Sequence, residues 1–166
     1  MSTDPLLFAL TLSAALGCGL IAGVFFAFSA FVMRALARLP AAEGIAAMQS
    51  INVAVINPLF LTTFLGTAAA CLLAVIYSLL GWHDTRAVYL LAGGVLYVVG
   101  SFLVTIVFNV PRNDALASVA PDDPDAASRW ARYVAGWTAW NHVRTAAALA
   151  AAASFSIALG YSAAPA

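Results

Sequence analysis

Four long apolar stretches constrain this chain more than any other feature of its sequence. Three of them contain no charged residue, Pro5–Met33, Pro58–Leu80 and Ala87–Val110, and the fourth, residues 125–161, becomes almost pure alanine in its second half. A helix needs about 20 apolar residues to cross the hydrocarbon of a bilayer. Since 166 residues leave room for four such crossings and short connections, the sequence predicts an all-α, four-transmembrane-helix bundle that forms one membrane domain over residues 1–166.

The composition agrees with a membrane location. Apolar residues make up 64% of the chain and charged residues only 8%, whereas about a quarter of a soluble domain is charged. All seven basic residues are arginines, and seven acidic residues balance them. A nucleic-acid-binding surface is therefore not expected, and the lipid bilayer is the partner that the composition indicates.

Prolines and polar residues give the expected helix limits. We predict helices over about 5–36, 41–80, 86–110 and 125–161, with a polar loop over 112–124. The second helix should kink near Pro58, and the third should stop at Pro111, because proline lacks a donor and disfavours helix in the residue before it. Asp4 stands where a signal peptide carries bases, so the first helix is expected to remain as an anchor. Gly19 and Gly23 form a small-xxx-small pair suited to helix packing, and a homodimer stays open.

The arginines are distributed unevenly over the connections. Five lie after the first and third helices, Arg34, Arg38, Arg112, Arg129 and Arg132, and only Arg86 lies between the second and third. By the positive-inside rule, the first and third connections are cytoplasmic and both termini face outward, as in a bacterial inner-membrane protein. Trp82, His83 and Asp84 are expected to form an ordinary interfacial turn at the opposite end.

Polar residues gather at the cytoplasmic ends of the second, third and fourth helices, where we predict a polar pocket. They are Gln49, Ser50, Asn52 and Asn57, then Asn109, Arg112, Asn113 and Asp114, and finally Trp137, Trp140, Asn141, His142 and Arg144. Helical periodicity places Trp137, Asn141 and Arg144 on one face and His142 about 100° away from Asn141. An ionisable residue at membrane depth, such as Arg144, indicates function.

Simpler roles exist for each of these residues taken singly. Asn52 and Asn57 could form interhelical hydrogen bonds, and Trp130, Trp137 and Trp140 could belong to an interfacial aromatic belt. The arginines at positions 34, 38, 129 and 132 could be topology signals or headgroup contacts. None of these roles explains why several asparagines and two arginines coincide on three converging helix ends.

Several chemistries are not expected. Cys18 and Cys71 lack a Cys-x-x-Cys partner, so no thiol oxidoreductase centre is expected. His83 and His142 should lie at opposite membrane faces, which excludes haem held by two histidines and a multi-histidine metal site. We therefore predict no metal and no cofactor, although haem on a single histidine, or flavin, stays open. No acid lies within an apolar run, unlike in a proton-coupled exporter.

Four segments carry a family resemblance. Gly23–Arg34, Met48–Pro58, Phe108–Asn113 and Trp137–Arg144 together resemble the anthrone oxygenase-like family of small four-helix membrane proteins. The resemblance implies oxidation of an anthrone to an anthraquinone with dioxygen. An anthrone enolate can pass an electron to dioxygen directly, so such an enzyme need not carry a metal or flavin.

The resemblance also implies roles for individual residues. His142 would be the base, since histidine exchanges protons near neutral pH. Arg112 or Arg144, with Asn109 or Asn141, would hold the enolate oxygen. Substrate binding would fall to the remaining polar and aromatic candidates, Asn52, Asn57, Asn113, Trp137 and Trp140.

The expected function is a membrane oxygenase or oxidoreductase acting on a planar, lipophilic aromatic molecule such as an anthrone or hydroquinone. Two other classes stay open at this point. The same polar cluster could bind or transport a lipophile or lipid headgroup, or it could dock another membrane protein.

Overall fold

The computed structural model describes residues 4–81, 85–120 and 123–163, and this part of the chain is helical without strands. Residues 82–84, which hold the expected interfacial turn with His83, and residues 121–122 lie outside it. The first helix comprises α1 (Pro5–Ala27), a π-helical turn η1 (Phe28–Val32) and α2 (Met33–Leu36). The elements that follow are α3 (Ala41–Ala54), α4 (Pro58–Leu80), α5 (Thr85–Tyr97), η2 (Val98–Leu103), η3 (Thr105–Asn109), α6 (Val110–Ala117) and α7 (Ala126–Ala163).

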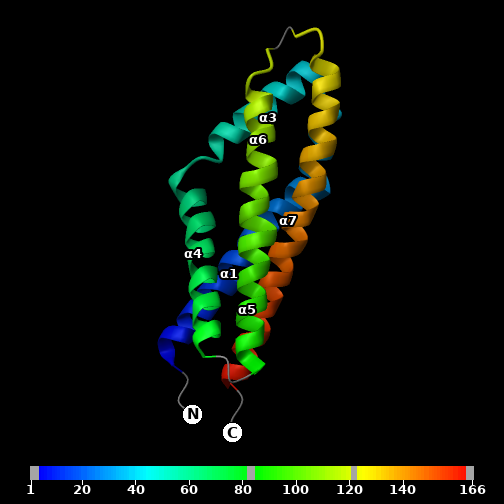
Figure 1. Ribbon diagram of the computed structural model, residues 1–166. Coiled ribbons are helices and arrows are strands. Elements are labelled where there is room, and N and C mark those ends of the chain that lie inside the picture. Colours follow the sequence, from blue (N-terminus) through cyan, green and yellow to red (C-terminus); the bar gives the residue numbers. More distant parts are fainter. Residues whose placement is uncertain (1–3, 82–84, 121–122, 164–166) are drawn as a thin grey trace.

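Four helices of the described chain are long and apolar enough to cross a membrane: Pro5–Leu36, Pro58–Leu80, Thr85–Ala117 and Ala126–Tyr161. They run side by side in an elongated bundle, with the start of α1 and the end of α7 at the same end (Figure 1). The all-α, four-spanning prediction is therefore confirmed. The opposite end, where α3, α6 and the start of α7 meet, is called the polar end below.

Small side chains let the membrane-spanning helices approach closely. Buried alanines and cysteines of α1, α4 and α7 line the core, among them Ala14, Cys18, Cys71, Ala148 and Ala151. A Cβ on Gly94 would stand 2.7 Å from the Cys71 carbonyl oxygen, and one on Gly100 would stand 2.6 Å from the Ala147 Cβ. Both glycines are thus required for the contacts of the third helix with α4 and α7.

The expected glycine pair of the first helix does not make such a contact. A Cβ on Gly19 or Gly23 would meet nothing within 4 Å, whereas one on Gly17 would collide with the Thr67 side chain. Within one chain, Gly19 and Gly23 therefore do not mediate the close helix packing that was expected of them. Close packing of α1 depends on Gly17 instead.

A second apolar core lies at the polar end. It joins residues of α2, α3, α6 and α7, including Met33, Ile45, Leu116, Trp130 and Trp137. Helix α3 crosses this end at a steep angle to the other helices (Figure 1). A Cβ on Gly44 would stand 2.8 Å from the Trp130 ring, so α3 packs directly on α7. Helix α3 thus covers the polar end of the bundle by packing on α2, α6 and the start of α7.

Two expected helix limits are corrected. The second helix is not a single kinked helix over 41–80, because α3 ends at Ala54 and Asn57, with extended backbone, caps a separate helix α4. The third helix does not stop at Pro111 but continues to Ala117. A π-helical turn precedes Pro111, and there the Val110 N–H bonds to Thr105, five residues back. This widened turn relieves the clash that proline makes with an α-helical turn. Because the helix continues to Ala117, the connection is shorter than the predicted 112–124 loop.

Candidate functional site

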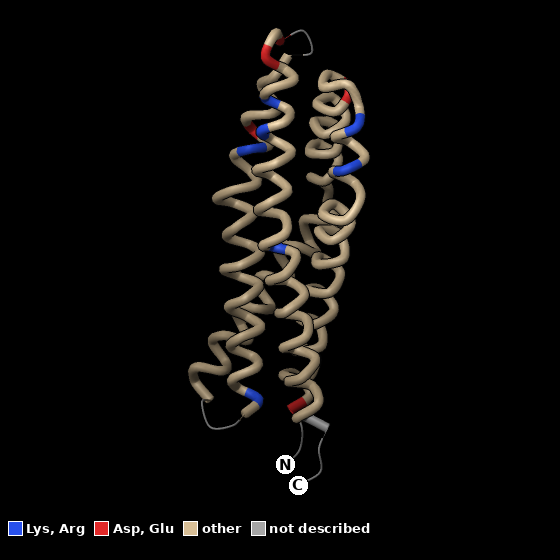
Figure 2. Tube along the Cα trace, turned by 90° about the vertical axis from the view of Figure 1, so that its right-hand side faces the viewer, with Lys and Arg blue, Asp and Glu red and all other residues tan. Residues whose placement is uncertain are grey.

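Charged residues are concentrated at the polar end of the bundle. Figure 2 shows most of them on the connections and helix ends there, with a single basic residue near the middle of the molecule. Arg144 is the arginine within the apolar part of α7. This distribution draws attention to two places, the polar end and the surroundings of Arg144.

Arg144 is a buried cation that lies over two aromatic rings. Its side chain is only 5% exposed, and its guanidinium carbon lies 4.0 Å from the Phe25 ring centroid and 4.8 Å from that of Trp137. The Nε group donates to Asn141 Oδ1 at 2.8 Å, and Nη1 donates to Thr105 Oγ1 at 3.2 Å. The ion pair found among the described residues joins Arg129 to Asp123, so Arg144 is stabilised by amide, hydroxyl and ring contacts.

Asn141 connects Arg144 to the first helix. Its Nδ2 group donates to the Phe25 carbonyl at 2.7 Å and to Ser29 Oγ at 2.6 Å. Ser29 also lies 3.4 Å from the Thr145 hydroxyl. This face of α7 was expected to meet the second and third helices, so the contacts with Phe25 and Ser29 of the first helix were not predicted. Both residues lie within the motif segment Gly23–Arg34, which is the signal that could have indicated them.

Asn109 and Asn113 fasten the third helix to α7. Asn113 Oδ1 accepts hydrogen bonds from the Tyr133 hydroxyl and from Trp137 Nε1, both at 2.9 Å. Asn109, which is 1% exposed, donates to the Trp137 carbonyl at 3.2 Å, and its Oδ1 is buried without a partner. Trp137 is thus fixed from both sides. Trp140, which was expected to bind substrate, stacks on Phe108 with ring centroids 3.5 Å apart.

The candidates of the second predicted helix separate into different roles. Asn57 accepts from the Phe60 N–H and donates to the Ala54 carbonyl, so it caps α4 instead of joining the cluster. Gln49 donates to the carbonyls of Leu116 and Val119 and ties α3 to α6. Asn52 reaches the Tyr133 side chain. Of the three, Asn52 is the one whose side chain joins the Tyr133–Asn113 contacts.

His142 lines a groove on another side of α7. The groove has a volume of about 400 Å³ and runs between the end of the first helix and α7. Its lining residues are Ser29, Met33, Arg34, Ala37, Val134, Ala135, Thr138, Ala139 and His142. His142 is exposed and Thr138 Oγ1 is buried without a partner. At its inner side, the groove reaches Ser29 of the Arg144–Asn141 network.

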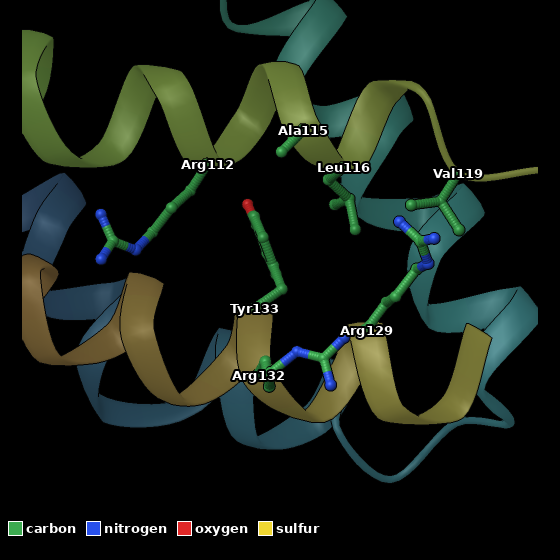
Figure 3. A pocket seen from close by; sticks show the side chains of 7 residues that line it. All are labelled: Arg112, Ala115, Leu116, Val119, Arg129, Arg132 and Tyr133. Atoms are coloured by element: carbon green, nitrogen blue, oxygen red, sulfur yellow. The ribbon is translucent and has the colours of Figure 1, made fainter. Parts of the chain in front are cut away.

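Arg112 belongs to a second cavity, between α6 and α7. Its volume is about 340 Å³, and it is lined by Arg112, Ala115, Leu116, Val119, Arg129, Arg132 and Tyr133. Tyr133 projects from α7 toward α6 in the middle, with Arg129 on one side of it and Arg112 on the other (Figure 3). The Arg112 Nη1 group donates to the Phe108 carbonyl. The expected single pocket is therefore divided into a groove, a cavity and the buried network between them.

The two cysteines, which are far apart in the sequence, meet in the structure. The sulfurs of Cys18 and Cys71 lie 3.7 Å apart in the buried α1–α4 contact. Both side chains are fully buried, which keeps the thiols away from aqueous reagents. No group of three or more His, Cys, Asp or Glu side chains suited to a metal ion occurs within the described ranges.

Comparison with known proteins identifies the family. The family model described as Anthrone oxygenase matches residues 58–154. This chain belongs to the anthrone oxygenase family. The matched segment begins with α4 and ends within α7, so it contains Asn109, Asn113, Asn141 and Arg144 of this family member. No curated protein and no solved structure matches the chain.

Proposed function

We propose that this anthrone oxygenase family member is a membrane oxidoreductase that uses dioxygen to oxidise a planar, lipophilic anthrone or hydroquinone. The substrate would lie in the groove between the first helix and α7. One observation carries the proposal: His142 and Arg34, a base and a cation, line the same largely apolar groove. The membership of the family supports the reaction type.

Each part of the groove has a function in this chemistry. Met33, Ala37, Val134, Ala135 and Ala139 provide an apolar lining of the kind that small-molecule sites use. His142 accepts the proton that an anthrone methylene or a hydroquinone hydroxyl loses. The Arg34 guanidinium and the Thr138 hydroxyl stabilise the oxyanion that forms. Exposure of the groove on the outside of the bundle lets an apolar substrate enter from the lipid.

The proposed oxidation of an anthrone balances without a further reactant. The methylene loses one proton to His142, and the resulting enolate gives its electrons to dioxygen, which forms a carbon–oxygen bond. The peroxide then loses the second methylene proton while its O–O bond breaks. The carbonyl keeps one oxygen atom. The other leaves as water with both methylene protons, the one that His142 held and the one released as the O–O bond breaks.

Arg144 is a positioning residue in this proposal. Two of its nitrogens donate to Asn141 and Thr105, and its guanidinium carbon lies over the Phe25 and Trp137 rings. It therefore acts through Asn141, which holds Ser29 at the inner side of the groove. This role differs from the expectation that Arg144 itself holds the enolate oxygen.

The test is oxygen consumption by the purified full chain in nanodiscs, with anthrone or a lipophilic hydroquinone as substrate. His142→Gln should lower the catalysed rate about 100-fold, since a general base contributes about 10²–10⁴-fold. His83→Gln, the same substitution at the other histidine, should keep the wild-type rate. Empty nanodiscs measure the uncatalysed oxidation. Substrate binding by wild-type protein without any added oxygen consumption would replace the oxygenase by a lipophile-binding function.

A further inference from the structure

The cavity between α6 and α7 contains an excess of positive charge. Arg112, Arg129 and Arg132 line it, and the acid that pairs with them among the described residues is Asp123, 3.2 Å from Arg129 Nε. This pair is solvent-accessible, with side chains 48% and 19% exposed, so it neutralises the cavity weakly. Arg132 has only a 3.5 Å contact to the Ser128 hydroxyl. The cavity therefore suits an anion.

The depth of the cavity matches the headgroup layer of a bilayer. The spans Thr85–Ala117 and Ala126–Tyr161 contain 33 and 36 residues, so each is about 50 Å long at a rise of about 1.5 Å per residue. The hydrocarbon core is about 30 Å thick. Arg86 already stands at the opposite end, so most of the excess length extends beyond the hydrocarbon at the polar end, where the cavity lies.

The lining also fits a lipid better than a free ion. Ala115, Leu116 and Val119 form an apolar wall on the α6 side. Figure 3 shows Arg129 extending across the cavity toward this wall, and the Arg132 side chain comes from the same helix. Guanidinium groups bind phosphate through paired N–H donors, and basic pockets between membrane helices hold anionic headgroups.

We propose that the α6–α7 cavity is a binding site for the phosphate of an anionic phospholipid, held by Arg129 and Arg132 beside the apolar wall of α6. The site is separate from the groove of His142, which lies between the first helix and α7. It adds a structural lipid to the protein whatever reaction the groove performs. A bound headgroup would also add to the hydrogen bonds by which Tyr133 and Trp137 of α7 hold Asn113 of α6.

Lipid binding by the full chain in neutral detergent tests the proposal, with bound lipid counted by native mass spectrometry. Phosphatidylglycerol should be retained over phosphatidylcholine, and Arg132→Gln should weaken its retention about tenfold. Arg132 is chosen because its substitution leaves the Arg129–Asp123 pair intact. Arg38→Gln removes the same charge from an exposed position of the connection after α2, and it should retain the lipid as the wild type does.

Three outcomes would overturn the proposal. Equal retention of the two lipids would show that the cavity does not select an anion. Equal losses in Arg132→Gln and Arg38→Gln would assign the preference to overall surface charge. Displacement of the bound lipid by millimolar inorganic phosphate would make the cavity a site for a soluble anion. Oxygen consumption is not the readout, so failure here leaves the proposed reaction untouched.

Discussion

At the scale of single residues, a buried arginine depends on one asparagine. Asn141 accepts from Arg144 Nε and donates to the Phe25 carbonyl and Ser29 Oγ. A buried guanidinium is costly unless its donors are paired. The contacts of Arg144 with Phe25 and Trp137 supply cation–π stabilisation as well, but ring faces accept no directed hydrogen bond at Nε.

Asn141→Leu is expected to destabilise the protein while keeping the side-chain size. The change leaves Arg144 Nε without its acceptor and Ser29 without its donor, which should lower the free energy of unfolding by about 1–3 kcal/mol. Reversible denaturation in detergent micelles, followed by circular dichroism, measures it. The control is Ser156→Ala, an exposed position of the same helix where the hydroxyl donates to the Ala152 carbonyl one turn earlier. Wild-type stability of Asn141→Leu would contradict the importance of this asparagine.

At the scale of helices, single glycines determine how closely two elements approach. Gly94 lies against α4, where a Cβ would stand 2.7 Å from a backbone oxygen, whereas a Cβ on Gly66 would meet nothing within 4 Å. A backbone atom cannot move aside as a flexible side chain can. The two positions therefore form a matched pair in neighbouring membrane-spanning helices.

Gly94→Ala should separate α5 from α4 and lower stability by about 1–3 kcal/mol, because overpacking a close contact forces backbone shifts. Gly66→Ala should be neutral or slightly stabilising, since alanine favours helix over glycine. Thermal unfolding in the same detergent compares them. If both variants unfold at one temperature, the α4–α5 contact is looser than described.

At the scale of the whole molecule, the arginines predict its orientation. Five of the seven lie on connections at the polar end or at the helix ends beside them, and an arginine excess favours the cytoplasmic side. Both ends of the described chain, at α1 and α7, lie at the opposite end (Figure 1). The polar end, with its groove and cavity, should therefore be cytoplasmic.

A reporter fused to the C-terminus tests this orientation in a bacterial host. Alkaline phosphatase, which is active only outside the cytoplasm, should be active in the fusion, and a fusion after Ala117 should be inactive. The opposite pattern would reverse the orientation and place the three-arginine cavity on the outer face. Expression of both fusions, checked by blotting, is the control.

The sequence by itself determined the number of spans, the helical class, the family resemblance and the concentration of charge at one end. These properties follow from apolar length, local charge and contiguous motifs. The tertiary structure decided which residues meet. Arg144 contacts the Phe25 ring and its partner Asn141 donates to Ser29, both more than a hundred positions away. Cys18 contacts Cys71, and His142 lines a groove on another side of α7. Such contacts depend on how each helix is rotated about its axis and shifted along it relative to its neighbours. Glycines and small side chains on both helices of a pair determine how closely the two approach, so no single segment of the sequence specifies these contacts.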